Sequence, residues 1–160
     1  MPEPMRVLFV CTGNTCRSPI AEALARRFAA ERSLSEISVG SAGTAAWDGA
    51  PASDGALLVA MERSVDLSTH RARLLTRELV RGSDLILAMG PHHLERIEAL
   101  GGTGKAHLLS SYASKGRSDR SITDPFGGDL DVYRSAFDEL DREVQQAIDR
   151  IAAERAPRRS

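Results

Sequence analysis

Two cysteines and an arginine stand close together in the run Cys11-Thr-Gly-Asn-Thr-Cys-Arg17. An apolar segment precedes this run and a segment with helical spacing follows it, so we expect it to form a turn between a strand and a helix. Peptide N–H groups at the start of a helix and the positive charge of Arg17 both stabilise a thiolate at Cys11. Cys11 is therefore a candidate nucleophile.

The same seven residues have the right length to curl around an anion, with backbone N–H groups converging on it. Gly13 is able to adopt the positive φ that such a nest requires. The planar guanidinium of Arg17 can hold two oxygens of a phosphate, which a lysine cannot do. No Gly-Lys-Ser/Thr closes the turn, so it is not a nucleotide-binding loop. The pattern predicts a site for phosphate or another oxyanion beside a reactive thiol.

The segments around this turn alternate between strand and helix patterns. Apolar or β-branched runs predict strands over 5–10, 37–39, 85–89 and 106–109. Apolar residues three or four positions apart predict helices from 18 onward, over 53–63, after 76, around 94–100 and over 133–151. We expect Ser18 to cap the first helix and Pro19 to be its first residue. The alternation predicts an α/β fold, a single-domain open four-stranded parallel sheet flanked by helices on both faces.

Length and composition exclude several classes of protein. The 160 residues correspond to one domain, which we assign to 1–154, and we expect 155–160 to form a frayed tail. The net charge of −1 offers no general attraction for nucleic acid. No apolar run approaches the ~20 residues needed to cross a membrane. Two cysteines so close together cannot staple the domain, and so few thiols favour a reducing, cytoplasmic compartment.

The run Val7-Leu-Phe-Val-Cys-Thr-Gly-Asn-Thr-Cys-Arg-Ser-Pro-Ile-Ala-Glu-Ala23 contains the Cys-x5-Arg-Ser signature of cysteine phosphatases. It resembles the low-molecular-weight protein tyrosine phosphatase family, and the resemblance covers nearly the whole chain. This resemblance implies phosphorylated proteins as substrates, a phosphocysteine intermediate on Cys11, and neither a cofactor nor a metal. It also implies a phosphate-binding loop formed by Thr12, Gly13, Asn14, Thr15, Cys16 and Ser18, with Arg17 on the phosphate oxygens.

A thiolate that attacks phosphorus needs an acid to protonate the leaving group. The family places an Asp-Pro in a late loop, and Asp124-Pro125 lies in the segment 110–131, which has no apolar periodicity. Pro125 keeps Asp124 out of the helical conformation and so extended. The resemblance therefore implies that Asp124 is the general acid.

The resemblance also implies residues that support the loop. Asn14, Ser41 and His70 match positions that pin the strained turn, and Ser18 matches the residue that hydrogen-bonds the nucleophilic sulfur.

Two further features are interpreted from the residues alone. His92 and His93 open a helix without acidic or thiol partners at ligand spacing, so we expect them to face solvent and not to bind a metal. Cys16 has two interpretations: a small buried side chain, or a redox partner whose reversible disulfide shields Cys11 from irreversible oxidation.

Three residues bear on the substrate. Thr15 stands where tyrosine phosphatases of the family generally carry an aliphatic residue, and Phe126 follows Asp124-Pro125 where the eukaryotic type has two tyrosines. Both features resemble the bacterial protein-arginine phosphatase branch. A hydroxyl at Thr15 suits a polar N–P substrate, and Phe126 can stack on a guanidinium. Trp47 is either part of the rim of the site or an anchor of the loop 42–51.

The resemblance leaves alternatives to an arginine phosphatase. A tyrosine phosphatase uses the same machinery. An arsenate reductase of this fold needs a further cysteine pair, and no cysteine follows Cys16. A phosphopeptide-binding module without catalysis would be expected to lack Cys11 or Asp124.

Overall fold

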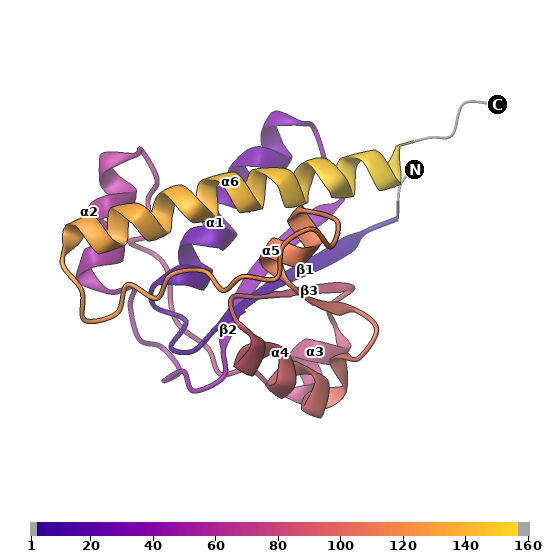
Figure 1. Ribbon diagram of the computed structural model, residues 1–160, viewed down its shortest axis with the longest axis horizontal. Coiled ribbons are helices and arrows are strands. Elements are labelled where there is room, and N and C mark those ends of the chain that lie inside the picture. The colour runs from indigo at the N-terminus through magenta and orange to yellow at the C-terminus, as the bar shows by residue number, and fades with distance from the viewer. Residues whose placement is uncertain (1–2, 157–160) are drawn as a thin grey trace.

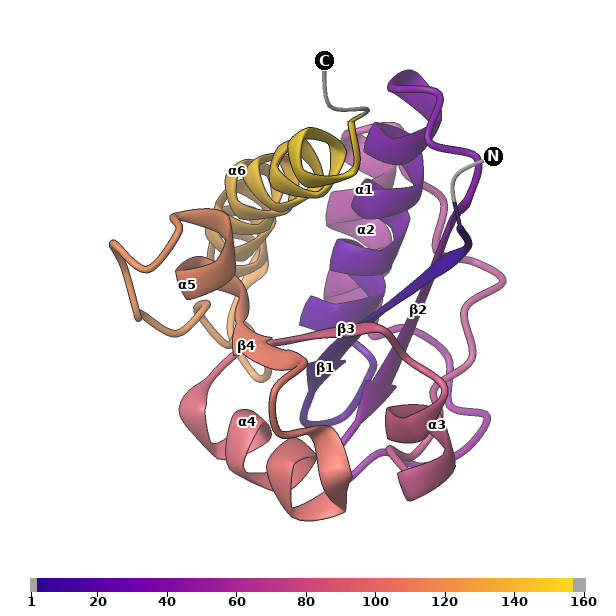
Figure 2. The ribbon, with the colours of Figure 1, turned by 90° about the vertical axis from the view of Figure 1, so that its right-hand side faces the viewer.

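The computed structural model describes residues 3–156. Four parallel strands form one sheet in the order β2-β1-β3-β4 (Figures 1 and 2; β4 is labelled in Figure 2). The strands are β1 (Met5–Cys11), β2 (Ile37–Gly43), β3 (Leu85–Ala88) and β4 (Ala106–Leu108). The predicted α/β architecture is confirmed, and β1 is a central strand whose carboxyl end carries the candidate nucleophile.

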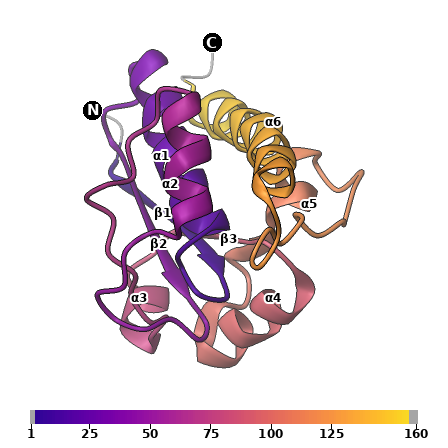
Figure 3. The ribbon, with the colours of Figure 1, turned by 90° about the vertical axis from the view of Figure 1, so that its left-hand side faces the viewer.

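Helices cover both faces of this sheet. They are α1 (Arg17–Glu31), α2 (Asp54–Glu62), α3 (Arg77–Arg81), α4 (Pro91–Ile97) with the π-helical turn η1 (Glu98–Gly102), α5 (Leu109–Ala113) and α6 (Leu130–Arg155). Figures 2 and 3 show α1, α2, α5 and α6 on one side of the sheet and α3 and α4 on the other.

Alternate side chains of β1 explain why both faces are covered. Val7, Phe9 and Cys11 enter the larger core cluster with residues of α1, α2, α5 and α6. Leu8 and Val10 enter a smaller cluster beneath α3 and α4. Because successive side chains of a strand point to opposite faces, an apolar run as continuous as this one needs an apolar layer on each side.

The second strand is longer than its apolar run suggests. β2 pairs with β1 residue by residue as far as Cys11 opposite Gly43, so Ser41 lies within the strand and not after it. A side chain at Gly43 would stand only 2.4 Å from the Thr12 carbonyl oxygen. Glycine therefore lets this strand lie directly against the turn that follows β1.

The first helix begins differently from the prediction. It starts at Arg17, after the N-cap residue Cys16, whose side chain makes no capping hydrogen bond. The prediction that Ser18 caps the helix and Pro19 opens it is wrong, because the Ser18 hydroxyl is engaged with Cys11 and Asn14 instead. The side chain expected to stabilise the helix stabilises the preceding turn.

The expected irregular segment 110–131 is shorter than predicted. Its start is helical, because the single turn α5 buries Leu109 and Tyr112 against the larger core. Asp129 caps α6 by accepting a hydrogen bond from the Val132 N–H. The irregular part is therefore 114–129, hereafter the acid loop, because it contains Asp124, the residue expected to be the general acid. The expected tail at 155–160 falls mainly on 157–160, outside the described residues, while α6 itself continues to Arg155.

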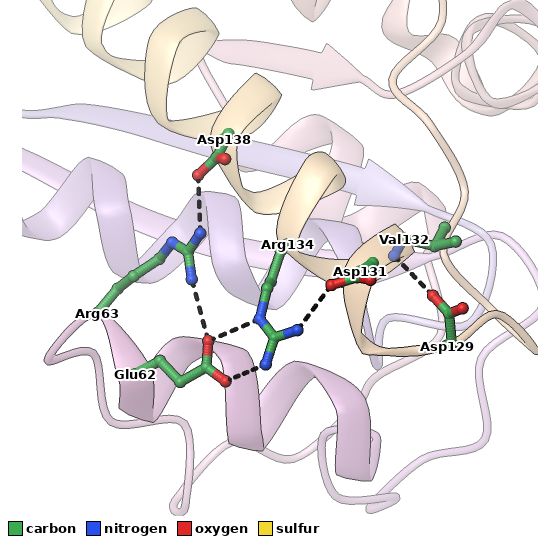
Figure 4. Close-up of polar contacts among 7 residues, drawn as sticks. All are labelled: Glu62, Arg63, Asp129, Asp131, Val132, Arg134 and Asp138. Carbon is green, nitrogen blue, oxygen red and sulfur yellow. Dashed lines mark hydrogen bonds and ion pairs between the residues drawn. The ribbon is translucent and has the colours of Figure 1, made fainter.

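The start of α6 is tied to the end of α2 by exposed ion pairs (Figure 4). Arg134 binds the Glu62 carboxylate through two nitrogens, at 2.7 and 3.0 Å, and reaches Asp131 at 2.8 Å. Arg63 contacts Glu62 at 3.3 Å and Asp138 at 3.1 Å. These contacts fix the point where the acid loop enters α6.

Across residues 3–156, no helix is both long and apolar enough to span a membrane.

Candidate active site

The candidate nucleophile lies at the floor of a cavity of about 180 Å³ at the carboxyl edge of the sheet. Cys11 ends β1, and its side chain is buried. The cavity is lined by Cys11, Thr12, Gly13, Thr15, Cys16, Arg17, Asp124 and Phe126. The structure therefore brings the residues expected for nucleophile, phosphate binding and acid into one cavity, although Asp124 is 107 positions after Arg17 in the sequence.

The turn between β1 and α1, hereafter the phosphate loop (11–18), directs its carbonyl groups outward. Five of its carbonyl oxygens have hydrogen-bond partners outside the turn: those of Cys11, Thr12, Asn14, Thr15 and Cys16. Their partners are, in the same order, Thr44 N, Ala45 N, His70 Nε2, Ser53 N and Ile20 N. Within residues 3–156, no hydrogen bond takes up the backbone N–H groups of 12–16. A loop whose carbonyls are held on the outside leaves its N–H groups for an anion at its centre.

Asn14 holds the strained part of the loop. Its φ is +55°, and its side chain is fully buried. The amide Nδ2 donates to Ser18 Oγ at 2.8 Å and to Ser41 Oγ at 2.9 Å, while Oδ1 accepts from the Arg73 N–H at 2.9 Å. His70 Nε2 lies 2.7 Å from the Asn14 carbonyl oxygen. The residues expected to support the loop are brought together around Asn14.

Gly13 does not adopt the positive φ of which it is capable, since the left-handed residue of the loop is Asn14. Asparagine tolerates this conformation better than most residues, because its short amide can hydrogen-bond locally. Gly13 lines the cavity instead, and a Cβ there would meet Thr15 Oγ1 at 3.4 Å, an ordinary contact.

Ser18 faces the candidate nucleophile. Its Oγ lies 2.9 Å from Cys11 Sγ, and both atoms are buried. Because Ser18 Oγ already accepts a hydrogen bond from Asn14 Nδ2, its own hydrogen is free to point at the sulfur. A hydroxyl donor at this distance stabilises negative charge on Cys11.

Two residues that support this network were not predicted from the sequence. Glu22 accepts a hydrogen bond from Ser41 Oγ at 2.8 Å and pairs with Arg26 at 2.7 Å. Arg73 donates its backbone N–H to Asn14 and its Nε to the Ser41 carbonyl oxygen at 2.9 Å. Glu22 stands one turn after Ser18 in α1, a spacing that could have drawn attention to it; Arg73 has no comparable local signal.

Asp124 and Arg17 meet at the mouth of the cavity. Arg17 is buried, and its guanidinium donates to the Ile122 carbonyl oxygen at 3.2 Å and lies 3.6 Å from Asp124 Oδ2. The Asp124 side chain is 55% exposed, and Oδ1 accepts from the Phe126 N–H at 3.1 Å. A carboxyl group at the solvent boundary of the cavity can reach both a bound group and water.

Cys16 is a free thiol within a small polar cluster. Its sulfur lies 3.2 Å from Ser53 Oγ and 3.5 Å from the Tyr133 hydroxyl, which are themselves 3.2 Å apart. Burial, and then the hydrogen bond to Cys16, raise the pKa of Tyr133 above its ordinary value. Cys16 is thus buried yet hydrogen-bonded, which leaves open both its packing interpretation and its redox interpretation.

The two histidines of α4 differ, and the expectation for one of them is wrong. His92 is exposed, as predicted, but His93 is fully buried, and its Nε2 lies 2.8 Å from Thr12 Oγ1. The helix begins at Pro91 directly after β3, so its first turn lies at the same sheet edge as the phosphate loop. In the described part of the chain, no three His, Cys, Asp or Glu residues are grouped to hold a metal.

The candidate specificity residues are placed unequally. Thr15 and Phe126 both line the cavity, and Phe126 is 77% exposed at its edge. Trp47 is 84% exposed and is not among the lining residues, so neither a rim contact nor a packed anchor is visible for it.

Comparison with known proteins places this site in context. The sequence model of one family, described as low molecular weight phosphotyrosine protein phosphatase, matches residues 6–157. The protein-arginine-phosphatase of Bacillus subtilis is 37% identical over 153 residues, which cover 94% of this chain and 99% of that protein. The low molecular weight protein-tyrosine-phosphatase PtpB of Staphylococcus haemolyticus is 39% identical over 137 residues, 85% of this chain and 92% of that protein.

Solved structures agree with this likeness. The YwlE arginine phosphatase from Geobacillus stearothermophilus superposes with a TM-score of 0.86 at 37% identity, over 94% of this chain and 95% of that one. A mutant of the YwlE arginine phosphatase with a phosphorylated active-site serine gives a TM-score of 0.88 at 36% identity, over 94% and 98% of the two chains.

Proposed function

This chain belongs to the low molecular weight phosphotyrosine protein phosphatase family, and from that membership we propose that it removes phosphoryl groups from arginine residues of proteins. Members of the family are hydrolases that act through a cysteine phosphoenzyme intermediate. The observation that carries the choice of arginine is Thr15, a hydroxyl-bearing residue in the wall of the cavity above Cys11. The relative that covers 94% of this chain and is named a protein-arginine-phosphatase supports the same choice.

In the first step of the proposed mechanism, the Cys11 thiolate attacks phosphorus. The S–P bond forms as the P–N bond to the guanidine breaks, and Asp124 gives a proton to the departing nitrogen. The outward-held carbonyls of the phosphate loop leave its N–H groups to bind the phosphoryl oxygens, together with Arg17. Inorganic phosphate, or another oxyanion of similar shape, should therefore compete with substrate.

In the second step, water hydrolyses the phosphocysteine. The ionised Asp124 takes a proton from the water as its oxygen bonds to phosphorus, and the S–P bond breaks to restore the Cys11 thiolate. The Ser18 hydroxyl, 2.9 Å from the sulfur, stabilises the thiolate both before attack and after release. Asn14, Ser41 and His70 act by holding the loop in shape and take no part in proton transfer.

Tyrosine phosphatase activity is the second candidate function. Its support is that the relative PtpB, named a protein-tyrosine-phosphatase, shares 39% of its aligned residues with this chain. Phe126 serves either substrate, since an exposed ring at the cavity edge can lie against a guanidinium or a phenol. Thr15 is the position that should separate the two.

The test is a paired assay on peptides that differ only in phosphoarginine or phosphotyrosine. We expect a higher kcat/KM for phosphoarginine, and Thr15→Ile should shift the ratio toward phosphotyrosine. Cys11→Ser is the control that should abolish both activities. Equal or greater activity on phosphotyrosine in the unmodified chain would overturn the arginine proposal and leave the shared mechanism intact.

A reversible disulfide between Cys11 and Cys16 stays a proposal. A peroxide would oxidise the Cys11 thiolate to a sulfenic acid, and the Cys16 thiol would then displace water to form the bridge. The test is mass spectrometry after peroxide treatment, in which the Cys16→Ser variant should accumulate irreversibly oxidised forms of Cys11.

A rim role for Trp47, a cytoplasmic location and the lack of nucleic-acid partners remain predictions from sequence.

A further inference from the structure

We propose that His93 is a positioning residue that donates a hydrogen bond from Nε2 to Thr12 Oγ1 and so directs the Thr12 hydroxyl toward the active-site cavity. Nothing in the mechanism above uses His93. It is nonetheless fully buried at the carboxyl edge of the sheet, 2.8 Å from a residue of the phosphate loop. Buried polar side chains in such a place usually have a defined hydrogen-bonding task.

The hydrogen-bonding pattern of the ring selects its protonation state. Nδ1 is buried and has no partner among the described residues, whereas Nε2 faces Thr12. A neutral imidazole has one N–H and one lone pair, and a buried N–H without a partner is rarer than an unpaired acceptor. The hydrogen therefore belongs on Nε2. A charged ring would carry an N–H on both nitrogens and leave one of them unpaired.

The surroundings of the ring favour the same neutral state. Burial is the main cause, and the neighbouring His92 and Arg17 add to it, so that the pKa of His93 falls to about 3 despite the opposing charge of Asp124. His93 is thus a fixed donor across the working pH range and not a titrating acid or base.

Thr12 is the residue through which this donor acts. Its side chain is exposed at the mouth of the cavity, whereas Cys11 beneath it is buried. When Oγ1 accepts from His93, the hydrogen of the Thr12 hydroxyl must point elsewhere, and Thr12 lines the cavity. The hydroxyl then becomes a donor for an oxygen of a bound substrate or of the attacking water.

The test is a double-mutant cycle in which kcat/KM is measured on p-nitrophenyl phosphate. Hydrolysis of this substrate requires only the phosphatase activity of the family, so the result does not depend on whether the chain prefers phosphoarginine. His93→Leu should lower kcat/KM about tenfold, the worth of one neutral hydrogen bond. Thr12→Val should lower it by a similar factor. The double variant should be no worse than Thr12→Val alone, because His93 acts through Thr12.

Conservative variants separate positioning from folding. His93→Gln places an amide near the position of Nε2 and should restore activity to within about threefold, and Thr12→Ser should do the same by keeping a hydroxyl. His92→Gln, the exposed neighbour, is the matched control and should leave kcat/KM unchanged. If His93→Leu does not fold, His93→Gln takes its place in the cycle: alone it should stay within about threefold of the unmodified chain, and in the Thr12→Val background it should cause no further loss.

Three results would overturn the proposal. His93→Leu could reduce kcat/KM as much in the Thr12→Val background as in the unmodified chain, which would mean that the two residues act independently. Thr12→Val could equal the unmodified chain, which would deny the hydroxyl any role. The loss in His93→Gln could vary between pH 5 and 8, which would mean that His93 titrates during the reaction.

Discussion

The phosphate loop and the acid loop line the same cavity, but they are held in very different ways. The phosphate loop is largely buried, and Asn14 alone makes hydrogen bonds to residues of β2, α1 and the segment 70–73. The acid loop is anchored at Ile122, whose N–H donates to the Met89 carbonyl oxygen at 2.9 Å. Between 123 and 128, the hydrogen bonds in the described chain are local ones, and Asp124 also forms an ion pair with Arg17 of the phosphate loop at 3.6 Å.

This difference matches what each loop has to do. N–H groups that bind a phosphoryl group must already converge when the substrate arrives, because reorganising them during the reaction would raise the barrier. The acid must approach the leaving group, let the product depart and then face water, so exposure of Asp124 suits it. On the proposed function, the molecule therefore combines a preorganised phosphate loop with a more exposed general acid, Asp124.

Within the comparison of the two loops, the largest effect should be the loss of activity on removing the proposed acid. Asp124→Asn keeps the side-chain shape but has no proton to give, so kcat/KM, which reports the steps up to formation of the phosphocysteine, should fall by about 10²-fold or more on a phosphopeptide with a poor leaving group. The loss of kcat/KM should be much smaller on p-nitrophenyl phosphate, whose leaving group needs little protonation. The measurement is kcat/KM on both substrates, because hydrolysis of the phosphocysteine is common to them and limits kcat alike. An equal loss on the two would mean that Asp124 does not act as the acid.

The next effect is on the free energy of unfolding, and it tests how the phosphate loop is held. Asn14→Ala removes three side-chain hydrogen bonds and places an alanine, which tolerates a positive φ less well than asparagine, at φ +55°. The free energy of unfolding should therefore fall by about 2–4 kcal/mol. Denaturant unfolding followed by circular dichroism measures it. A loss below about 1 kcal/mol would show that the loop is not held through Asn14.

A smaller effect is expected from pH. His93 stays neutral in the folded chain because burial lowers its pKa to about 3, whereas in the unfolded chain it takes up a proton below about 6.5. Stability should therefore fall as pH drops from about 6.5 toward 3, by about 2 kcal/mol between pH 7 and 5. Comparing denaturant unfolding of the unmodified chain with that of His93→Gln isolates this contribution. Identical pH dependence in the two proteins would contradict it.

The smallest effect should come from the acid loop. Phe126 is 77% exposed, so Phe126→Ala should change the free energy of unfolding by less than about 0.5 kcal/mol. The same substitution should still weaken the binding of a substrate whose guanidinium or phenol ring lies against Phe126, and the measurement is a raised KM. A large loss of stability would mean that the acid loop is packed as firmly as the phosphate loop, and the contrast between them would fail.

Much of this architecture could be predicted from local patterns. The apolar run of β1 and the 3–4 spacing of α6 each identify one element without further context, and the cysteine turn identifies the anion site. The family resemblance implies that Asn14, Ser41 and His70 support the loop, and the structure joins these residues through hydrogen bonds.

The errors have a common physical cause. The sequence predicts a cap at Ser18 because capping depends on the residues that follow in the helix, whereas the Ser18 hydroxyl contacts Cys11 and Asn14 in the preceding turn. His93 was expected to face solvent because its partner Thr12 lies 81 positions away and only the strand order brings them together. Local patterns do not specify which side chain of a first helical turn faces a neighbouring loop.

The most direct measurement for the account as a whole is to trap the covalent intermediate. Asp124→Ala, mixed with substrate and quenched in acid, should carry one phosphoryl group, which peptide fragmentation should localise to Cys11 and not to Cys16, because loss of the base slows hydrolysis of the phosphocysteine more than its formation from a good leaving group. Cys11→Ser should show no turnover under the same conditions. Mass spectrometry that finds no phosphoryl adduct, or finds it on Cys16, would contradict the assignment of Cys11 as the nucleophile.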